Sequence, residues 1–134
     1  MSRWAILFAK KPEPGSVKTR LQPEFSSIES AELYSNFIKD CIENLARASV
    51  DHRLIAYSPS DAEAVLRKLN NSLGSFEYCP QGSGDLGARL NRAFNFIFAK
   101  GAERVVALGT DTPSLPPHYI NLAFDLLNSH DVVL

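Results

Sequence analysis

The chain has 134 residues, of which 45% are hydrophobic and 22% are charged, and its formal net charge is −1 at pH 7. This length is typical of a single domain, here 1–134, and the composition excludes disordered and collagen-like chains. Because the net charge is close to zero, no global electrostatic attraction favours nucleic acid or an anionic membrane. Cys41 and Cys79 are too few for a disulfide framework, so a cytoplasmic domain with reduced thiols is expected.

The apolar run at residues 4–9 follows Arg3 and superficially resembles the start of a secretory signal. A signal peptide needs about 7–15 apolar residues before a cleavage site, and Lys10 and Lys11 end this run too early. No stretch approaches the ~20 apolar residues that a membrane-spanning helix needs. The run is therefore expected to be a buried first strand.

Hydrophobic periodicity alternates along the chain between short apolar runs and segments with apolar residues at helical spacing. Strands are expected at residues 4–9, 52–57, 75–79, 104–108 and 131–134. This alternation predicts an α/β fold, a Rossmann-like three-layer sandwich whose mostly parallel sheet has helices on both faces. In such sheets ligands bind outside the carboxyl ends of the strands, near the topological switch point. The loops after the first, third and fourth strands are therefore the places to look for a site.

The four helices expected between these strands begin and end at recognisable signals. The first two have capping-box patterns, in which a glutamate follows a serine by three residues, at Ser26–Glu29 and at Ser60–Glu63. The third is expected to end at Gly101, and the fourth to start at Pro116-Pro117. The phenylalanines of the third helix recur at helical spacing and are expected in the core.

The loop after the first strand, residues 10–20, is strongly basic. Its only acidic residue is Glu13, and its basic residues are Lys10, Lys11, Lys18 and Arg20. The loop therefore has a formal charge of +3, which leaves −4 on the rest of the chain. Lys and Arg neutralise phosphate oxygens, so this loop is a candidate anion site, with a solvated basic turn as the alternative. It lacks the glycine spacing of a P-loop.

A G-x-G-x-x-G pattern follows the third strand, at Gly82, Gly84 and Gly87. Alone it would indicate dinucleotide binding at a helix N-terminus. Because Pro80-Gln81 separates it from the strand and it does not open the fold, an NAD-binding domain is the less favoured interpretation. Asp85 also suits the N-cap of the following helix. A nucleotide-contacting loop of another kind is expected here.

Asp111 directly follows the fourth apolar run, where its carboxylate is expected to face the ligand cleft. Mg²⁺ favours few protein carboxylates together with waters and substrate phosphates, so one aspartate opposite a cationic loop fits a metal site. An Asx-turn before Pro113 is the alternative. The histidines lack metal-ligand spacing and are expected at the surface: His52, His118 and His130. No base partner marks Cys79 as a nucleophile.

Taken together, the three loops resemble a bacterial GT-A-like glycosyltransferase family, also called radical-SAM/selenodomain-associated transferases. The matching strings are FAKKPEPGSVKTRL at residues 8–21, QGSGDLGARL at 81–90 and GTDTPSLP at 109–116. They occur in family order, and residues 131–134 match the next element, so the resemblance covers essentially the whole chain. The last string also looks like the one in molybdenum-cofactor guanylyltransferases, a related branch of the same fold.

The resemblance implies a nucleotide-diphospho-sugar transferase fold that binds a nucleotide or sugar nucleotide with Mg²⁺ or Mn²⁺ for glycosyl or nucleotidyl transfer. It also implies that Lys18 and Arg20 contact phosphates and that Asp111 holds the metal, which makes these three the expected catalytic residues. The expected nucleotide contacts are Ala9, Lys10, Pro14, Gly15, Lys18, Arg20, Gln81, Gly82, Gly84, Asp85, Gly87 and Thr110.

Members of the resembling family continue beyond the last expected strand with sequence that supplies much of the acceptor side, whereas the printed chain stops at Leu134. The expectation is therefore the nucleotide-binding portion of a longer domain, truncated at its C-terminal end. A non-catalytic module or inactive fragment that binds a nucleotide or phosphosugar is the alternative. The sequence indicates no particular acceptor.

Overall fold

The computed structural model describes residues 2–15, 25–111 and 113–134. These residues form an α/β fold with an all-parallel sheet of four strands and four helices, which confirms the expected class. The strands are β1 (Arg3–Lys10), β2 (His52–Ser58), β3 (Glu77–Pro80) and β4 (Arg104–Leu108). The helices are α1 (Ser27–Arg47), α2 (Glu63–Asn70), α3 (Leu86–Ala99) and α4 (Pro117–Leu126). Within the described ranges, none of these helices has the length and hydropathy of a membrane span.

The strand order is β3-β2-β1-β4, so the chain reverses its direction of winding between β1 and β4. Lys10 pairs with Ser58, Tyr57 with Pro80 and Leu7 with Leu108, all in parallel register. The carboxyl ends of all four strands therefore lie at one edge of the sheet. The switch point between β1 and β4 is at this edge, where open α/β sheets bind ligands.

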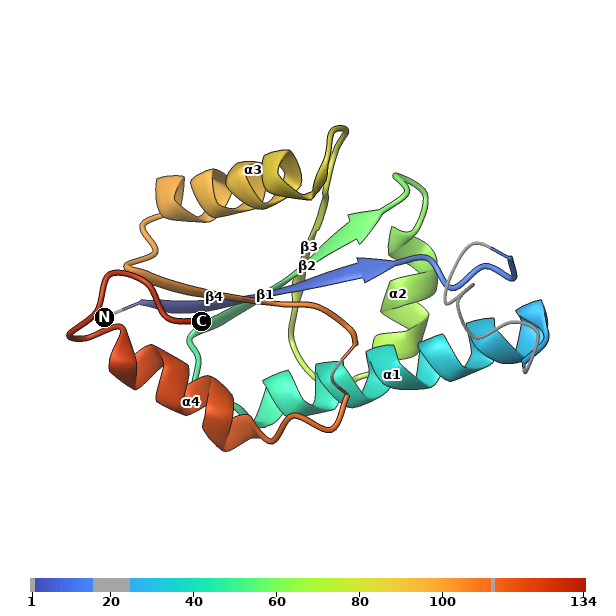
Figure 1. Ribbon diagram of the computed structural model, residues 1–134, viewed down its shortest axis with the longest axis horizontal. Coiled ribbons are helices and arrows are strands. Elements are labelled where there is room, and N and C mark those ends of the chain that lie inside the picture. Colours follow the sequence, from blue (N-terminus) through green and yellow to red (C-terminus); the bar gives the residue numbers. More distant parts are fainter. Residues whose placement is uncertain (1, 16–24, 112) are drawn as a thin grey trace.

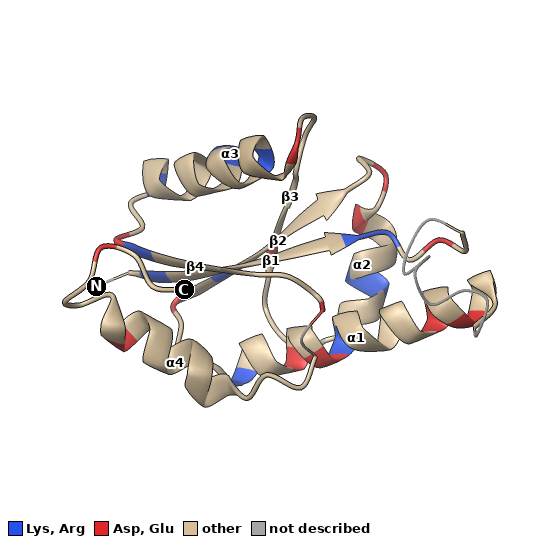
Figure 2. Cartoon of the chain, viewed as in Figure 1, with Lys and Arg blue, Asp and Glu red and all other residues tan. Residues whose placement is uncertain are grey.

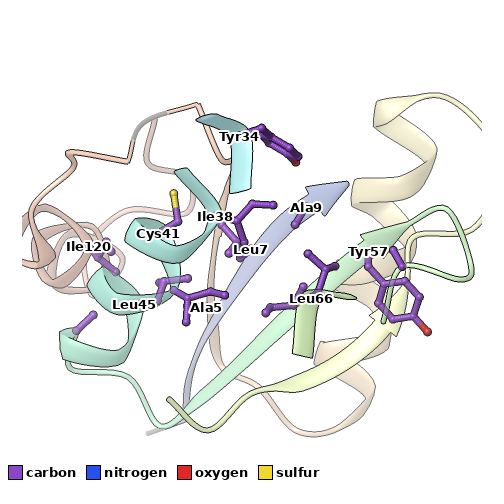
Figure 3. Packing of buried hydrophobic residues seen from close by; sticks show 14 of the residues in the cluster. Ala5, Leu7, Ala9, Tyr34, Ile38, Cys41, Leu45, Tyr57, Leu66 and Ile120 are labelled. Atoms are coloured by element: carbon purple, nitrogen blue, oxygen red, sulfur yellow. The ribbon is translucent and has the colours of Figure 1, made fainter. Parts of the chain in front are cut away.

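Helices cover both faces of the sheet, as Figure 1 shows: α1, α2 and α4 lie on one face and α3 on the other. Alternate residues of β1 and β2 point to opposite faces, so both strands are buried on both sides. The larger core lies beneath α1, α2 and α4 (Figure 3) and contains Leu7, Ile38, Leu66 and Phe124 among its fully buried side chains.

The two capping-box predictions have different outcomes. In α1 the box forms, because the Glu29 N–H donates to Ser26 Oγ and the Ser26 N–H donates to Glu29 Oε1, both at 3.0 Å. In α2 the prediction is wrong: Ala62, not Ser60, stands at the N-cap, and no side chain caps the helix. The Glu63 carboxylate accepts hydrogen bonds from side chains of β2 and α2 instead.

Two further predictions are wrong on the α3 side of the sheet. Residues 131–134 form no strand; they line a groove of about 660 Å³ together with α3 and β4. Periodicity cannot decide the structure of so short an apolar run. Phe98 is 48% exposed and Phe94 is half-buried, because α3 buries only Ala93 and Ile97 and β4 is an edge strand with half-buried side chains.

Candidate functional site

The loops after β1, β3 and β4 meet at the carboxyl edge of the sheet, as the topology predicts. Gln81 follows β3, and its side-chain amide reaches across β2: Nε2 donates to the carbonyl of Ala56 at 2.9 Å and to that of Ala9 in β1 at 3.3 Å. On the other face, Tyr34 of α1 joins the end of β1 to Thr110, which follows β4. Side-chain hydrogen bonds therefore connect the three loops.

Gln81 is the anchor of the glycine loop, residues 81–85. It is 5% exposed, and its backbone N–H donates to the Tyr57 carbonyl at 2.8 Å. Arg89, in the second turn of α3, donates from a terminal nitrogen to Gln81 Oε1 at 3.1 Å and from Nε to the Gly84 carbonyl at 2.9 Å. One guanidinium thus holds both ends of the turn, which fixes the shape of the loop from behind.

The first two glycines of the pattern have backbone conformations that favour glycine. Gly82 has φ +80° and Gly84 φ +103°. A Cβ at Gly82 would meet a terminal nitrogen of Arg92, which donates to the Gln81 carbonyl. A side chain there would shift the end of this flexible arginine side chain, so the positive φ, and not the contact, is what favours glycine at position 82.

The other two residues predicted in this loop belong to the start of α3. The Asp85 carboxylate accepts from the Ala88 N–H at 2.9 Å, which confirms Asp85 as the N-cap. Gly87 lies in the first turn of α3, where a Cβ would meet only the Asp85 carboxylate, at an ordinary 3.6 Å. Nothing in the local backbone requires glycine at position 87.

The basic loop after β1 is partly compensated by acidic residues (Figure 2). Lys11 Nζ lies 3.0 Å from Glu13 Oε1 and 3.2 Å from Asp61 Oδ2, which follows β2. Hydrogen bonds to these two carboxylates raise the pKa of Lys11. Lys10, in contrast, is exposed and has no carboxylate partner among the described residues.

Other residues predicted in this loop are less defined by contacts. Pro14 and Gly15 are exposed, and Gly15 adopts φ +82° in a turn. Lys18 and Arg20 lie outside the described residues, so their predicted contacts with phosphates stay predictions.

Asp111 is brought to the same edge by the turn after β4. Thr110, the preceding residue, is 6% exposed and donates from Oγ1 to the Tyr34 hydroxyl at 3.2 Å, while the Lys10 N–H donates to that hydroxyl at 2.8 Å. Burial raises the pKa of Tyr34 above its usual value, and the negative charge of Asp111 raises it further, while the hydrogen bonds from Thr110 and Lys10 oppose the increase. Asp111 itself is exposed.

The predicted surface position of the histidines is confirmed. The three histidines are exposed, and no group of three or more His, Cys, Asp or Glu side chains gathers among the described residues. Burial raises the pKa of the Cys79 thiol, which keeps it protonated and poorly nucleophilic at neutral pH.

Sequence reasoning missed Tyr34 and Arg89, which link the loops. Tyr34 looks like one more residue of an apolar helical stripe, and the only hint is a hydroxyl that must find a partner when buried. Arg89 follows the glycine pattern by two residues, but its bonds to Gln81 and Gly84 depend on how the loop folds back onto α3.

Comparison with known proteins shows which family the chain belongs to. Residues 41–134, which include the glycine loop and Asp111, match the model of a family described as an uncharacterized protein conserved in bacteria (DUF2064). The chain belongs to this family. No curated protein matches the chain.

Two solved structures share the fold. A protein of Desulfovibrio desulfuricans G20 assigned as a nucleotide-diphospho-sugar transferase is 35% identical over 96% of this chain, with a TM-score of 0.84. The chain spans only 56% of the length of that protein. A cytidylyltransferase from Leptospira borgpetersenii serovar Hardjo-bovis (strain JB197) matches 97% of this chain and 50% of its own, with a TM-score of 0.64. At 13% identity, this second similarity shows the fold alone.

Proposed function

We propose that this chain is the nucleotide-binding part of a metal-dependent transferase that uses a nucleoside-diphosphate sugar or a nucleoside triphosphate. The observation that carries the proposal is that the basic end of β1, the glycine loop and Asp111 lie at one edge, around the switch point of a parallel sheet. The similarity to the D. desulfuricans protein supports the class of substrate.

The residues at this edge fit Mg²⁺ or Mn²⁺ bound together with a diphosphate. Mg²⁺ keeps several waters and is held by one or two carboxylates plus substrate phosphates, so it needs no protein cage. Asp111 supplies one exposed carboxylate, and no cluster of three potential ligands lies among the described residues. A bound metal would neutralise negative charge on the phosphate oxygens.

The chain's own groups then bind and orient the ligand. Lys10 and, by extension of the same loop, Lys18 and Arg20 provide positive charge for phosphate oxygens. The exposed backbone of residues 82–84 can offer its peptide groups to a polar part of the nucleotide. Catalysis would consist of positioning and electrostatic stabilisation, which requires no nucleophilic side chain.

Calorimetric titration tests the assignment of Asp111. Nucleoside diphosphates, nucleoside triphosphates and sugar nucleotides are first screened by thermal shift, because a ligand that binds the native state raises its apparent stability. Asp111→Asn is expected to abolish the gain in affinity that Mn²⁺ provides for the best ligand. Asp125→Asn is the matched control, because Asp125 is exposed on α4, where it pairs with Arg3. Equal behaviour of the two variants would refute the role of Asp111.

The basic loop is tested separately. Lys18→Ala is expected to weaken nucleotide binding about tenfold or more, as is typical for loss of a charged contact. Lys100→Ala, which removes an exposed lysine next to Glu77, is the control. If Lys18→Ala binds as tightly as Lys100→Ala, the proposed phosphate contact is wrong.

A second candidate is a nucleotide-binding module without turnover. It is favoured by one observation: nearly half of the D. desulfuricans protein lies outside the match. Hydrolysis or transfer of a sugar nucleotide by the 134-residue chain alone, lost in Asp111→Asn, would exclude this candidate.

A further inference from the structure

Tyr34 lies between two of the loops that form the proposed site. It belongs to α1, and Figure 3 shows it beside Ala9 at the carboxyl end of β1. Its hydroxyl accepts the Lys10 N–H at 2.8 Å and the Thr110 Oγ1–H at 3.2 Å. Those partners are 24 and 76 residues away in the sequence, so this hydroxyl joins segments that only the tertiary fold brings together.

The hydroxyl is not needed to fill the core. Tyr34 is 5% exposed, and a phenylalanine would occupy the same space without a polar atom to satisfy. Its two partners flank the proposed site instead. Lys10 begins the basic loop, and Thr110 immediately precedes Asp111.

We propose that Tyr34 is a positioning residue, whose hydroxyl holds the start of the basic loop at a fixed distance from the Asp111 turn. The inference rests on the proposed function, in which the basic loop binds phosphates and Asp111 binds the metal. A diphosphate bridged by a metal needs both groups at once, so its binding depends on their separation. The binding of phosphate alone, or of metal alone, depends much less on that separation.

This difference gives the experiment its readout. Inorganic pyrophosphate is the probe, because it reports on phosphate and metal contacts without assuming a base or a sugar. Its affinity is measured by calorimetry with and without saturating Mn²⁺. Tyr34→Phe is expected to lower the affinity for Mn²⁺–pyrophosphate about three- to tenfold, the range for loss of a hydrogen bond, and to change the affinity for pyrophosphate alone less than about twofold.

Tyr78→Phe is the matched control. The Tyr78 hydroxyl accepts a hydrogen bond from Asn70 Nδ2 at 3.2 Å, so this variant also removes a part-buried phenol bond, but among residues of α2 and β3. Tyr78→Phe should lose about as much thermal stability as Tyr34→Phe, but Mn²⁺ should increase its affinity for pyrophosphate as much as in the unaltered chain. A purely structural role of Tyr34 would make the two variants alike, and that result would overturn the inference.

Thr110 provides a second, independent route. Thr110→Val should reproduce the Tyr34→Phe defect, and Tyr34→Phe with Thr110→Val should lose little more affinity than either variant alone. Additive losses in the double variant would count against a shared contact.

Asp111→Asn in the same titration separates the two proposals. If it removes the enhancement by Mn²⁺ while Tyr34→Phe does not, only the inference on Tyr34 fails. If Asp111→Asn has no effect, or if the unaltered chain does not bind Mn²⁺–pyrophosphate, the proposed function fails and the inference with it.

Discussion

Replacement of Gln81 by methionine should destabilise the fold and weaken the proposed site together. Methionine is close to glutamine in length and volume, so the change removes hydrogen bonds with little change in packing. The Gln81 side chain takes part in three of them: two donated to the Ala56 and Ala9 carbonyls, and one accepted from Arg89. At about 1 kcal/mol for each neutral bond and somewhat more for the charged one, the expected loss is about 3–4 kcal/mol.

A loss of this size is a large fraction of the 5–15 kcal/mol that is typical of folded domains, and it corresponds to a decrease of roughly 10 °C in Tm. Urea unfolding can be followed through the single tryptophan, because Trp4 is 4% exposed in the native sheet and becomes solvated on unfolding. The same preparation is then titrated with Mn²⁺–pyrophosphate and with the best nucleotide from the thermal-shift screen.

Asn70→Leu is the control for this experiment. The Asn70 side chain is also buried, at 8% exposure, and it makes three hydrogen bonds, with the Gly74 carbonyl, the Gly74 N–H and the Tyr78 hydroxyl. Asn70→Leu should therefore lower the free energy of unfolding by a similar amount without weakening ligand binding. Wild-type stability in Gln81→Met would refute the energetic reasoning, and equally weakened ligand binding in Asn70→Leu would refute the specific role of Gln81 in the glycine loop.

Three further predictions concern α1. Arg53→Met should cost about 2–4 kcal/mol in urea unfolding, because the Arg53 guanidinium donates three hydrogen bonds to carbonyls at the C-terminal end of the helix, whereas a cost below 1 kcal/mol would contradict that capping role. Ser26→Ala should lower the free energy of unfolding by about 1 kcal/mol, whereas Ser60→Ala should leave it almost unchanged, because only the first predicted capping box forms. Equal losses in the two variants would contradict this difference. Because hydrogen bonds from Ser26 lower the pKa of Glu29 below 4.5, the stabilisation by Glu29 is present above pH 4.5 and is lost as the pH falls through the lowered value. Thermal unfolding between pH 3 and 6 should thus be less pH-dependent in Glu29→Gln, and an unchanged pH profile would contradict this assignment.

The fold was largely predictable because its signals are local and repeated. Two buried strands read as continuous apolar runs, and α1 carries both a capping box and a long apolar stripe. The signals fail where they are short. Ser60–Glu63 matches a capping box, but Glu63 bonds to Tyr57 and Arg67 instead, and four apolar-rich residues at 131–134 did not specify a strand.

The candidate site was predictable at the level of loops but not of contacts. Parallel strands bring their carboxyl ends to one edge, so the meeting of three loops follows from topology alone. Counting charges along the basic loop did not show that Lys11 pairs with Asp61, which lies 50 residues away in the sequence. The narrower likeness to radical-SAM-associated transferases and to molybdenum-cofactor guanylyltransferases stays a prediction, as do the metal and the substrate.

The contacts that sequence reasoning missed explain how a site made of loops can be held in place. Gln81 donates to the Ala9 carbonyl, and Tyr34 accepts from the N–H of the next residue, Lys10, so two side chains hold the two polar groups of the single Ala9–Lys10 peptide bond where β1 ends. Gln81 also accepts a hydrogen bond from Arg89 of α3, and Tyr34 also accepts one from Thr110 in the loop after β4. In the proposed function, a basic loop that starts from so constrained a point would need less reordering to bind an anion, and groups positioned in advance stabilise developing charge most effectively. Loosening either contact should therefore weaken ligand binding even though neither side chain needs to touch the ligand.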